Sequence, residues 1–246
     1  MADLLRPAPL LRLDGVHTHI GQYHILQGVD LAVPEGELTM LLGRNGAGKT
    51  TTLRTVMGMW RASAGSLGFG ETDLKPLATP DIARLGIGYV PENMGVFAGL
   101  TVRENMVLAA RDGAIDRGRL DWIFSLFPAL RKFWELPAGN LSGGQKQMLS
   151  IARAMIEPRR LILIDEPSKG LAPAIVDALI EAMLELKRTA TTILMVEQNF
   201  RMAQVLGDGV AVMDDGRVVH SGRMADLAAD PDLQARLLGL SLGAHQ

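Results

Sequence analysis

The sequence contains no cysteine, which excludes disulfides, thiolate metal sites and a cysteine nucleophile. It also lacks a long apolar run. A membrane-spanning helix needs about 18 consecutive apolar residues, and stretches such as residues 161–164 are far shorter. The first seven residues include an acid and a proline but no basic stretch before an apolar one, so we expect no signal peptide. Any role at a membrane is therefore expected to depend on a partner protein.

Basic charge is not in surplus, since 25 Lys and Arg residues face 27 Asp and Glu residues and the formal net charge is −2. Without a basic field, the protein is not expected to bind nucleic acid. Aromatic residues make up only 4%, but 48% of the residues are hydrophobic, which is typical of a folded globular protein. The 246 residues suit one large body with an inserted lobe.

The first part of the chain and the middle part differ in their apolar pattern. Apolar and polar residues alternate over residues 11–33, which predicts an antiparallel sheet with turns. Helical periodicity dominates residues 101–156 instead. Thr101 and Ser142 each have the spacing of a capping residue that begins a helix. We therefore expect a mostly helical lobe after the sheet.

The last third of the chain returns to strands. Short apolar runs at 161–164 and 192–196 flank a predicted helix at 173–187, and this order of elements predicts parallel strands. Residues 210–220 have the pattern of a hairpin, and a final helix is expected to close the chain. The chain as a whole is thus expected to have an α/β fold.

A glycine-rich loop carries the strongest functional signal. Residues 43–50 satisfy the pattern G-x-x-x-x-G-K-[ST] between an apolar strand and a predicted helix. In such a loop, backbone N–H groups and the helix N-terminus bind phosphates. Lys49 would reach the β and γ phosphates of a bound triphosphate, and Thr50 would offer its hydroxyl to Mg²⁺. The alternative is a glycine turn whose lysine is merely exposed. The predicted nucleotide-binding residues are Gly43, Arg44, Asn45, Gly46, Ala47, Gly48, Lys49, Thr50 and Thr51.

Two acids follow the apolar strand at 161–164. Asp165 stands where the carboxyl edge of a parallel sheet meets ligands, and we expect it to orient the Mg²⁺ shell. Glu166 would accept a proton from, or align, the water that attacks the γ phosphate, while Lys49 and the metal balance the phosphoryl charge. Alone, the two acids would indicate a solvated turn. Together with the glycine-rich loop, they predict a nucleotide-hydrolysing site, a combination that many nucleotide hydrolases share.

The run Leu-Ser-Gly-Gly-Gln at 141–145 forms a second anion-binding helix N-terminus. Alone, it would indicate a capped helix with a flexible loop. With the other two motifs, the chain resembles the ATP-binding cassette (ABC) ATPases over about residues 10–227. In that family this pentapeptide contacts the γ phosphate held by the opposite subunit. The resemblance implies a head-to-tail dimer with ATP between the subunits. It adds further nucleotide-binding residues, namely Ser142, Gly143, Gly144 and Gln145.

The same resemblance implies a P-loop NTPase (RecA-like) core with a mostly parallel sheet, an N-terminal antiparallel β subdomain and an inserted α-helical subdomain. We expect a single domain at 10–240. Within it, residues 10–92 would form the antiparallel sheet and the P-loop core, and residues 93–158 the helical subdomain. Residues 159–240 would form the second part of the core and the C-terminal helix.

Two positions of the site depart from the usual ABC pattern. Glu92 stands where a glutamine is usual, and its carboxylate could still bind Mg²⁺ directly or through water. Gln198 replaces the switch histidine, so this side chain can hydrogen-bond phosphate but cannot become cationic. The predicted catalytic residues are Glu166, Gln198 and Lys49, and the predicted metal ligands are Thr50, Asp165 and Glu92.

Further departures lie around the site. Ala172 stands where an aspartate is usual, and Lys169 where a leucine is more usual. Ile20 falls where an adenine-stacking aromatic is expected, and Tyr23 close by is either the stacking residue or a surface tyrosine. His17 alternates with the histidine at position 19, and we interpret both as solvent-facing side chains rather than metal ligands.

Glu92, Gln198 and the run at 165–173 together are similar to the smaller ATPase of branched-chain and other hydrophobic amino acid importers. This resemblance implies two transmembrane permease subunits, a second and different ABC ATPase and, indirectly, an external substrate-binding protein. It places the chain at the cytoplasmic face of the inner membrane as a peripheral subunit. The apolar residues at 92–97 would face a short permease helix, or pack beneath the helical lobe.

Two other functions stay open. A regulatory subunit of low turnover would bind ATP while its partner hydrolyses it. Gln198 and Ala172 favour this hypothesis, and Glu166 argues against it. A soluble cassette ATPase would act on a cytosolic assembly, and only the similarity to the importer subfamily opposes that hypothesis.

Overall fold

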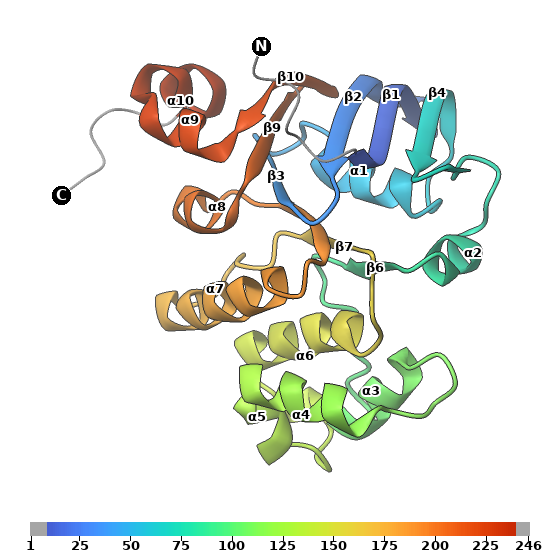
Figure 1. Ribbon diagram of the computed structural model, residues 1–246, viewed down its shortest axis with the longest axis vertical. Coiled ribbons are helices and arrows are strands. Elements are labelled where there is room, and N and C mark those ends of the chain that lie inside the picture. Colours follow the sequence, from blue (N-terminus) through green and yellow to red (C-terminus); the bar gives the residue numbers. More distant parts are fainter. Residues whose placement is uncertain (1–8, 240–246) are drawn as a thin grey trace.

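The computed structural model describes residues 9–239 and contains two sheets with helices around them (Figure 1). The N-terminal part forms an antiparallel sheet in the order β2-β1-β4-β5. Strands β1 and β2 pair along their whole length, which confirms the predicted antiparallel sheet. The strands of this sheet are β1 (Pro9–Ile20), β2 (Tyr23–Pro34), β4 (Ala62–Phe69) and β5 (Thr72–Asp73).

The second sheet has six strands in the order β10-β9-β3-β8-β7-β6. All neighbours in it are parallel except β9 and β10, which form the predicted hairpin. The mostly parallel core sheet is thereby confirmed. Its strands are β3 (Leu38–Gly43), β6 (Ile87–Val90), β7 (Leu161–Asp165), β8 (Thr192–Val196), β9 (Gly209–Asp214) and β10 (Arg217–Arg223).

Helix α1 (Lys49–Val56) lies between the two sheets, because its Leu53 and Val56 pack in one apolar cluster with both. The short helix α2 (Thr79–Arg84) joins the same cluster through Ile82. The opposite face of the central sheet is covered by α6 (Gly143–Met155), α7 (Pro173–Lys187) and α8 (Phe200–Leu206).

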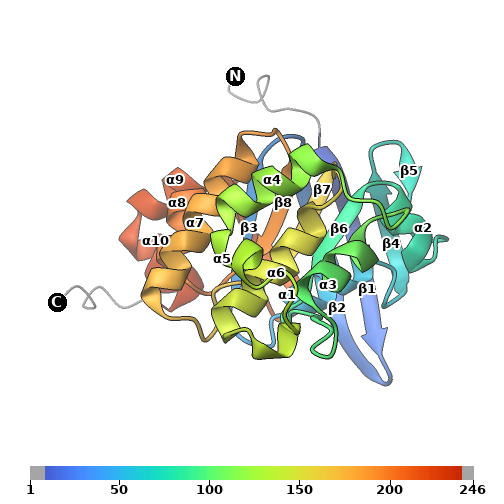
Figure 2. The same cartoon turned by 90° about the horizontal axis from the view of Figure 1, so that it is seen from below.

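The lobe beyond α6 contains only helices and loops, as the periodicity of residues 101–156 predicts (Figure 2). Its helices are α3 (Val102–Ala109), α4 (Arg117–Leu126), α5 (Pro128–Lys132) and the 3₁₀ turn Ala138–Asn140. Thr101 and Ser142 both form complete capping boxes at the starts of α3 and α6. The helical lobe and its two predicted helix starts are therefore confirmed.

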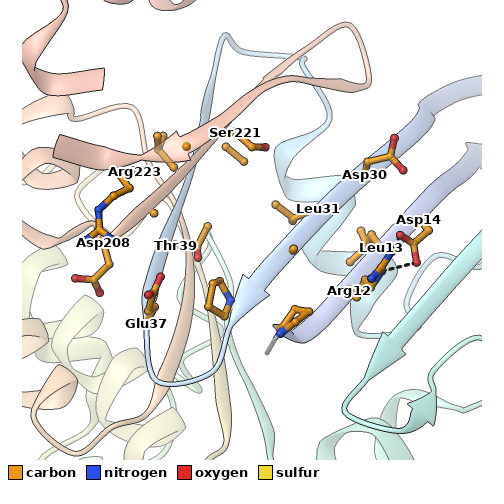
Figure 3. Close-up of a pocket in the computed structure, with 17 residues that line it drawn as sticks. Arg12, Leu13, Asp14, Asp30, Leu31, Glu37, Thr39, Asp208, Ser221 and Arg223 are labelled. Atoms are coloured by element: carbon orange, nitrogen blue, oxygen red, sulfur yellow. Dashed lines mark hydrogen bonds and ion pairs between the residues drawn. The ribbon is translucent and has the colours of Figure 1, made fainter. Parts of the chain in front are cut away.

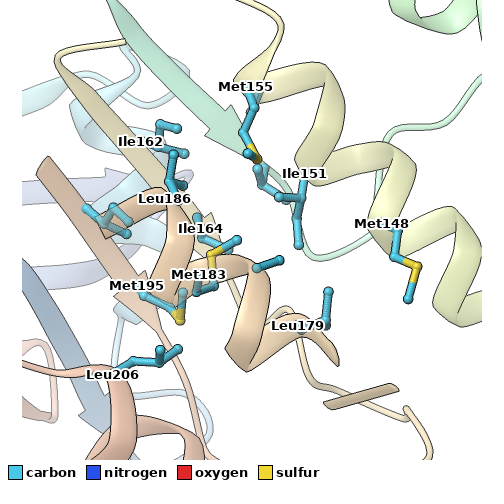
Figure 4. Packing of buried hydrophobic residues seen from close by; sticks show 14 of the residues in the cluster. Met148, Ile151, Met155, Ile162, Ile164, Leu179, Met183, Leu186, Met195 and Leu206 are labelled. Atoms are coloured by element: carbon cyan, nitrogen blue, oxygen red, sulfur yellow. The ribbon is translucent and has the colours of Figure 1, made fainter. Parts of the chain in front are cut away.

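The central strands are apolar at every position because both of their faces are buried. In β7, Leu161 and Leu163 point into the cluster around α1, whereas Ile162 and Ile164 point into the cluster around α6 and α7. Figure 4 shows the second cluster, to which Met148 and Met155 of α6 belong. These two methionines are core residues, as expected of flexible side chains that fill irregular gaps.

The end of the described chain differs from the prediction of one closing helix. Two short helices occur instead, α9 (Met224–Ala229) and α10 (Pro231–Leu238). Asp230 separates them and accepts a hydrogen bond from the backbone N–H of Leu233, which starts a new helix with a proline in its first turn. Among residues 9–239, no helix is both long and apolar enough to cross a membrane.

Candidate nucleotide site

The glycine-rich loop connects β3 to α1 and bends sharply at its glycines. Gly43 and Gly48 have φ angles of 140° and 100°, which favour glycine. A Cβ at Gly43 would lie 2.2 Å from the carbonyl oxygen of Met213 in β9, so the loop backbone also approaches that strand closely. The loop leads directly into the N-terminus of α1. The first backbone N–H groups of that helix lack helical partners and attract anions.

A cavity beside this loop brings together residues that are far apart in the sequence. Segments from β2, the loop, the stretch after β6 and the stretch after β7 all contribute to it. The cavity is lined by Ile25, Asn45, Gly46, Gly48, Lys49, Thr50, Thr51, Glu92, Glu166 and Lys169. Of the predicted loop residues, Gly43 and Arg44 line an adjoining pocket with Gln198, and Ala47 is buried.

Lys49 is buried, and its ammonium group contacts backbone carbonyls at the start of the loop. Its Nζ donates hydrogen bonds to the carbonyl oxygens of Gly43 at 2.9 Å and Arg44 at 3.0 Å, and it lies 3.8 Å from Oε1 of Glu166. Burial lowers the pKa of Lys49, and the carboxylates of Glu166 and Asp165 oppose that shift. These contacts hold the Lys49 ammonium group beside the space that the loop encloses.

Asp165 lies at the carboxyl end of β7, fully buried, with a hydroxyl group on each side. Thr50 donates to its Oδ1 at 3.0 Å, and the phenol of Tyr89 donates to its Oδ2 at 3.3 Å. Burial raises the pKa of Asp165, and the hydrogen bond from Thr50 opposes the shift. Burial and the charge of Asp165 raise the pKa of Tyr89 to about 12.

The neighbouring oxygen atoms of Thr50 and Asp165 fit a magnesium ion that arrives with a nucleotide. Mg²⁺ prefers oxygen ligands, and it is usually bound by one or two carboxylates together with substrate phosphates. A hydroxyl and a carboxylate oxygen 3.0 Å apart at the loop supply the protein share of such a set. Within residues 9–239, no group of three or more His, Asp or Glu side chains forms a metal cage of its own.

Glu166 and Gln198 meet across the loop, although 32 residues separate them in sequence. The amide of Gln198 donates to Oε1 of Glu166 at 2.7 Å and to Oδ1 of Asn45 at 2.8 Å. Glu166 is only 8% exposed. The structure therefore brings the predicted switch residue, the predicted water-activating acid and the loop into direct contact.

Glu197 contributes an anchor that the sequence patterns do not single out. Its buried carboxylate accepts hydrogen bonds from the backbone N–H and hydroxyl of Ser168 and from the backbone N–H groups of Gln198 and Asn199. These bonds tie the segment after β7 to the segment after β8. An acid directly after an apolar strand is the one sequence signal shared by Glu197 and Asp165.

Lys169 is the second missed member of the site. Its Nζ donates to Oε1 of Glu92 at 2.6 Å and lies 3.4 Å from Oε2 of Glu166. Among the described residues that Oε2 atom has no hydrogen-bond partner with good alignment. Lys169 thus joins the two carboxylates at the rim of the cavity, where the sequence marks it only as an unusual residue.

Tyr23 lies at the tip of the β1–β2 hairpin, 65% exposed and outside the lining of the cavity. Ile25 reaches the cavity instead, and sequence reasoning missed it. Thr18 pairs with Leu26 and His19 pairs with His24, so Ile25 is an extra residue in β2 at this point. Such a bulge redirects a side chain, and here it places Ile25 beside the loop. Adenine stacking by Tyr23 stays a prediction.

The N-terminus of α6 lies apart from this cavity and faces outward. Ser142 accepts a hydrogen bond from the backbone N–H of Gln145, whose side chain accepts one from the Ser142 N–H in return. Ser142 and Gly143 are exposed. Gly144 is buried, and a Cβ on it would lie 2.8 Å from Ile175 of α7. Only the second glycine is therefore required by packing within the subunit.

Two other features lie outside the site. A cleft between β1–β2 and β9–β10 is lined by Thr39, Glu37 and Arg223 among others, and shares no residue with the nucleotide cavity (Figure 3). On the antiparallel sheet, the His24 ring stacks on the His19 ring with 4.2 Å between the ring centroids. Its Nε2 also forms a hydrogen bond of 2.9 Å with Nδ1 of His17.

Comparisons with known proteins agree with this arrangement. The model of the family described as ABC transporter matches residues 26–169. The high-affinity branched-chain amino acid transport ATP-binding protein BraG of Pseudomonas aeruginosa is 38% identical over 232 residues, which cover 94% of this chain and 100% of the relative. The probable branched-chain amino acid transport ATP-binding protein LivF of Archaeoglobus fulgidus is 32% identical over 94% of this chain and 99% of its own length.

Solved structures show the same fold. An ATP-binding subunit of an ABC transporter superposes with a TM-score of 0.79 at 29% identity and covers 95% of this chain and 96% of its own. A nucleotide-free ATP-binding cassette superposes with a TM-score of 0.78 at 23% identity, covering 95% of this chain and 99% of its own. The expected arrangement of an antiparallel sheet beside a mostly parallel core is confirmed by these likenesses.

Proposed function

The chain belongs to the ABC transporter family as an ATP-binding, ATP-hydrolysing subunit, and we propose that it powers the import of branched-chain or other hydrophobic amino acids. The observation that carries this proposal is the 38% identity to a branched-chain amino acid transport ATPase, which extends over 94% of the chain. The archaeal relative of the same description supports it over an equal share. The run at 165–173 and the glutamine at 198 favour the same subfamily.

ATP would bind with its phosphates in the glycine-rich loop. Lys49 now donates to two loop carbonyls, and a triphosphate offers its ammonium group better acceptors. Thr50, Asp165 and Glu92 are the residues that would hold Mg²⁺. When bound, that ion neutralises the developing charge on the phosphoryl oxygens. Thr50 and Asp165 are already hydrogen-bonded to each other, so little reorganisation is required of them.

Glu166 would align the attacking water or accept its proton. Its Oε1 is held by Gln198 and lies near Lys49, so the carboxylate is fixed over the loop and pointed at the cavity. Gln198 has an amide that donates to Glu166 and Asn45. It can therefore position the acid and sense a phosphate without carrying charge.

The ATPase works as a dimer in this proposal. Ser142 and Gly143 are exposed, and the N-terminus of α6 does not line the subunit's own cavity. A helix N-terminus that presents free N–H groups to solvent can bind the phosphate held by a partner. The proposed partner is a second ABC ATPase packed head to tail, with one ATP between each loop and the opposite α6.

The permeases would contact the groove between the core and the helical lobe. This groove is lined by Asn93, Met94 and Arg153. Phe97 beside it is 50% exposed, and the guanidinium of Arg153 lies over its ring at 5.1 Å. An apolar and cationic groove suits a short helix from a membrane partner. The chain would then act at the cytoplasmic face of the inner membrane, with an external binding protein delivering substrate.

The test is affinity purification of the full chain from gently solubilised native membranes, followed by identification of every co-purifying polypeptide. We expect two multispanning proteins and a second cassette ATPase, and ATP hydrolysis by that complex that rises when a binding protein loaded with leucine or a similar amino acid is added. Recovery only from the soluble fraction with cytosolic partners would contradict import and favour a role in a cytosolic assembly.

A further inference from the structure

Lys169 lies in the segment between β7 and α7, and its side chain reaches the rim of the nucleotide cavity. The ammonium group contacts Glu92, which is 77 residues away in sequence, and Glu166, which is three residues away. Half of the side chain is open to solvent, with 57% of its surface exposed. Lys169 is therefore held by charge rather than by packing.

Two carboxylates lie around Lys169. Glu166 is nearly buried and already has Lys49 within 3.8 Å, whereas Glu92 is more exposed at the same rim, and the negative charges of the two acids repel each other. The Lys169 ammonium group lies within ion-pair distance of both.

We propose that Lys169 is a positioning residue of the nucleotide site, whose ammonium group pairs with Glu92 and Glu166 in the nucleotide-free subunit and so holds Glu92 away from the Mg²⁺ that this carboxylate would bind. This inference rests on the proposed binding of ATP with Mg²⁺. Lys169 must release Glu92 before that carboxylate can reach a metal or its water. The exposed stem of the lysine allows it to swing away without disturbing the core.

The position of the Lys169 charge has opposite effects on the affinity for ATP without metal and on the affinity for Mg²⁺. Lys169 lines the same cavity as Lys49, so it adds positive charge where the phosphates bind and favours ATP in the absence of metal. It also occupies a carboxylate that the metal would use, so it disfavours Mg²⁺. A residue with a merely structural role would shift both affinities in the same direction or neither.

The experiment measures binding of a fluorescent non-hydrolysable ATP analogue to the purified full chain by anisotropy. One titration contains EDTA, and the other varies Mg²⁺ at fixed analogue. For Lys169→Met, we expect roughly three- to fivefold weaker binding in EDTA and a half-saturating Mg²⁺ concentration roughly three- to fivefold lower, the range for a partly exposed ion pair. Lys169→Arg keeps the cation and should retain the wild-type values. Lys132→Met, at an exposed site in the helical lobe, is the matched control.

Unchanged affinities, or two shifts in the same direction, would overturn the role of Lys169 while leaving the proposed function intact. Failure of the wild-type chain to bind the analogue in either buffer would instead remove the proposed function and this inference with it. Thermal unfolding of each variant without nucleotide shows whether the chains compared are folded. If Lys169→Met does not fold, Lys169→Gln replaces it in both titrations with the same expected shifts.

Discussion

Glu166 holds its carboxylate over the glycine-rich loop with a backbone conformation that is uncommon for a residue other than glycine. Its φ angle is 47°, in the left-handed region. The surrounding contacts impose this conformation, because its N–H donates to the carbonyl of Val196 at 2.9 Å and its side chain accepts from Gln198. Strain of this kind persists where neighbours over-determine the backbone, and it is concentrated at functional sites.

We expect Glu166→Gln to reduce ATP hydrolysis by about 100-fold or more, the usual effect of removing a general base, while ATP binding is retained. The amide has nearly the same shape but cannot accept the proton. Phosphate release by the assembled complex and nucleotide binding by the same preparation are the two measurements. Glu181→Gln on the exposed face of α7 is the control. An unchanged hydrolysis rate would instead favour a regulatory subunit whose partner carries turnover.

A pH effect is expected at His24. Desolvation and the neighbouring His19 and His17 lower the pKa of His24 from its ordinary value of 6.5. Because the unfolded chain binds this proton more readily, the contribution of His24 to stability is present above pH 6.5 and is lost as pH falls toward the lowered pKa. In an NMR titration, His19→Asn should raise the pKa of His24, and His220→Asn should not. No rise in His19→Asn would show that the stacked rings do not interact.

The glycine-rich loop could be predicted from the sequence because its residues act through a backbone that is continuous in sequence. The contacts between Glu166 and Gln198 and between Glu92 and Lys169 could not. They depend on which strands are neighbours in the sheet and on side-chain directions set by packing. The position of Ile25 beside the cavity could not be predicted for a related reason, since a bulge in β2 changes the face of the strand on which Ile25 lies.

At the scale of elements, the most accurate predictions concern helices and strands whose ends carry a local chemical signal. Thr101 begins α3 with the expected side-chain cap, and Pro173 starts α7 in the first turn, where a missing N–H is tolerated. Strand β4 gives no such signal, because its residues include Ala, Ser and Gly. The backbone of Gly65 in this strand runs so close to β1 that a Cβ added to Gly65 would lie 2.1 Å from the carbonyl oxygen of Gly15. Close backbone approach, rather than apolar alternation, explains that strand.

Ala172 is the N-cap residue of α7, and no side chain caps this helix start within the described residues. We expect Ala172→Asp to stabilise the protein by about 1 kcal/mol, because an aspartate at this position accepts a hydrogen bond from the first-turn N–H groups and interacts favourably with the helix dipole. Urea unfolding measures the change. Ala172→Val adds bulk without an acceptor and should not stabilise. Equal stability of Ala172→Asp and wild type would mean that the helix start is satisfied in another way.

At the scale of the whole molecule, the two helix N-termini that we predict to bind phosphate lie apart. The start of α1 opens into the nucleotide cavity, whereas the start of α6 faces outward from the other side of the central sheet. Because the start of α6 does not line the nucleotide cavity of its own subunit, it could contact a nucleotide phosphate only in the cavity of a partner. This geometry is the physical reason for the proposed head-to-tail pair.

Gly143 and Gly144 form a matched pair that tests this arrangement. A Cβ at Gly143 would meet no described atom within 4 Å, whereas one at Gly144 would lie 2.8 Å from Ile175. We expect Gly144→Ala to destabilise the subunit by about 1–3 kcal/mol through overpacking. Gly143→Ala should leave its thermal unfolding unchanged or slightly raised. In the Glu166→Gln background, Gly143→Ala should nevertheless weaken ATP-dependent dimers measured by light scattering. A dimer that tolerates this change would contradict a partner phosphate at this glycine.

Strand β3, which leads into the glycine-rich loop, pairs with β8 on one edge and β9 on the other. Both neighbours belong to the last quarter of the chain, so the ribosome makes β3 long before either exists. An apolar strand with two open edges is a hazard for wrong pairing. In the growing chain, β3 is expected to lack both of its sheet partners until residues 209–214 have left the ribosome. We therefore expect the nascent chain to acquire ATP binding only after residues 209–214 have been made.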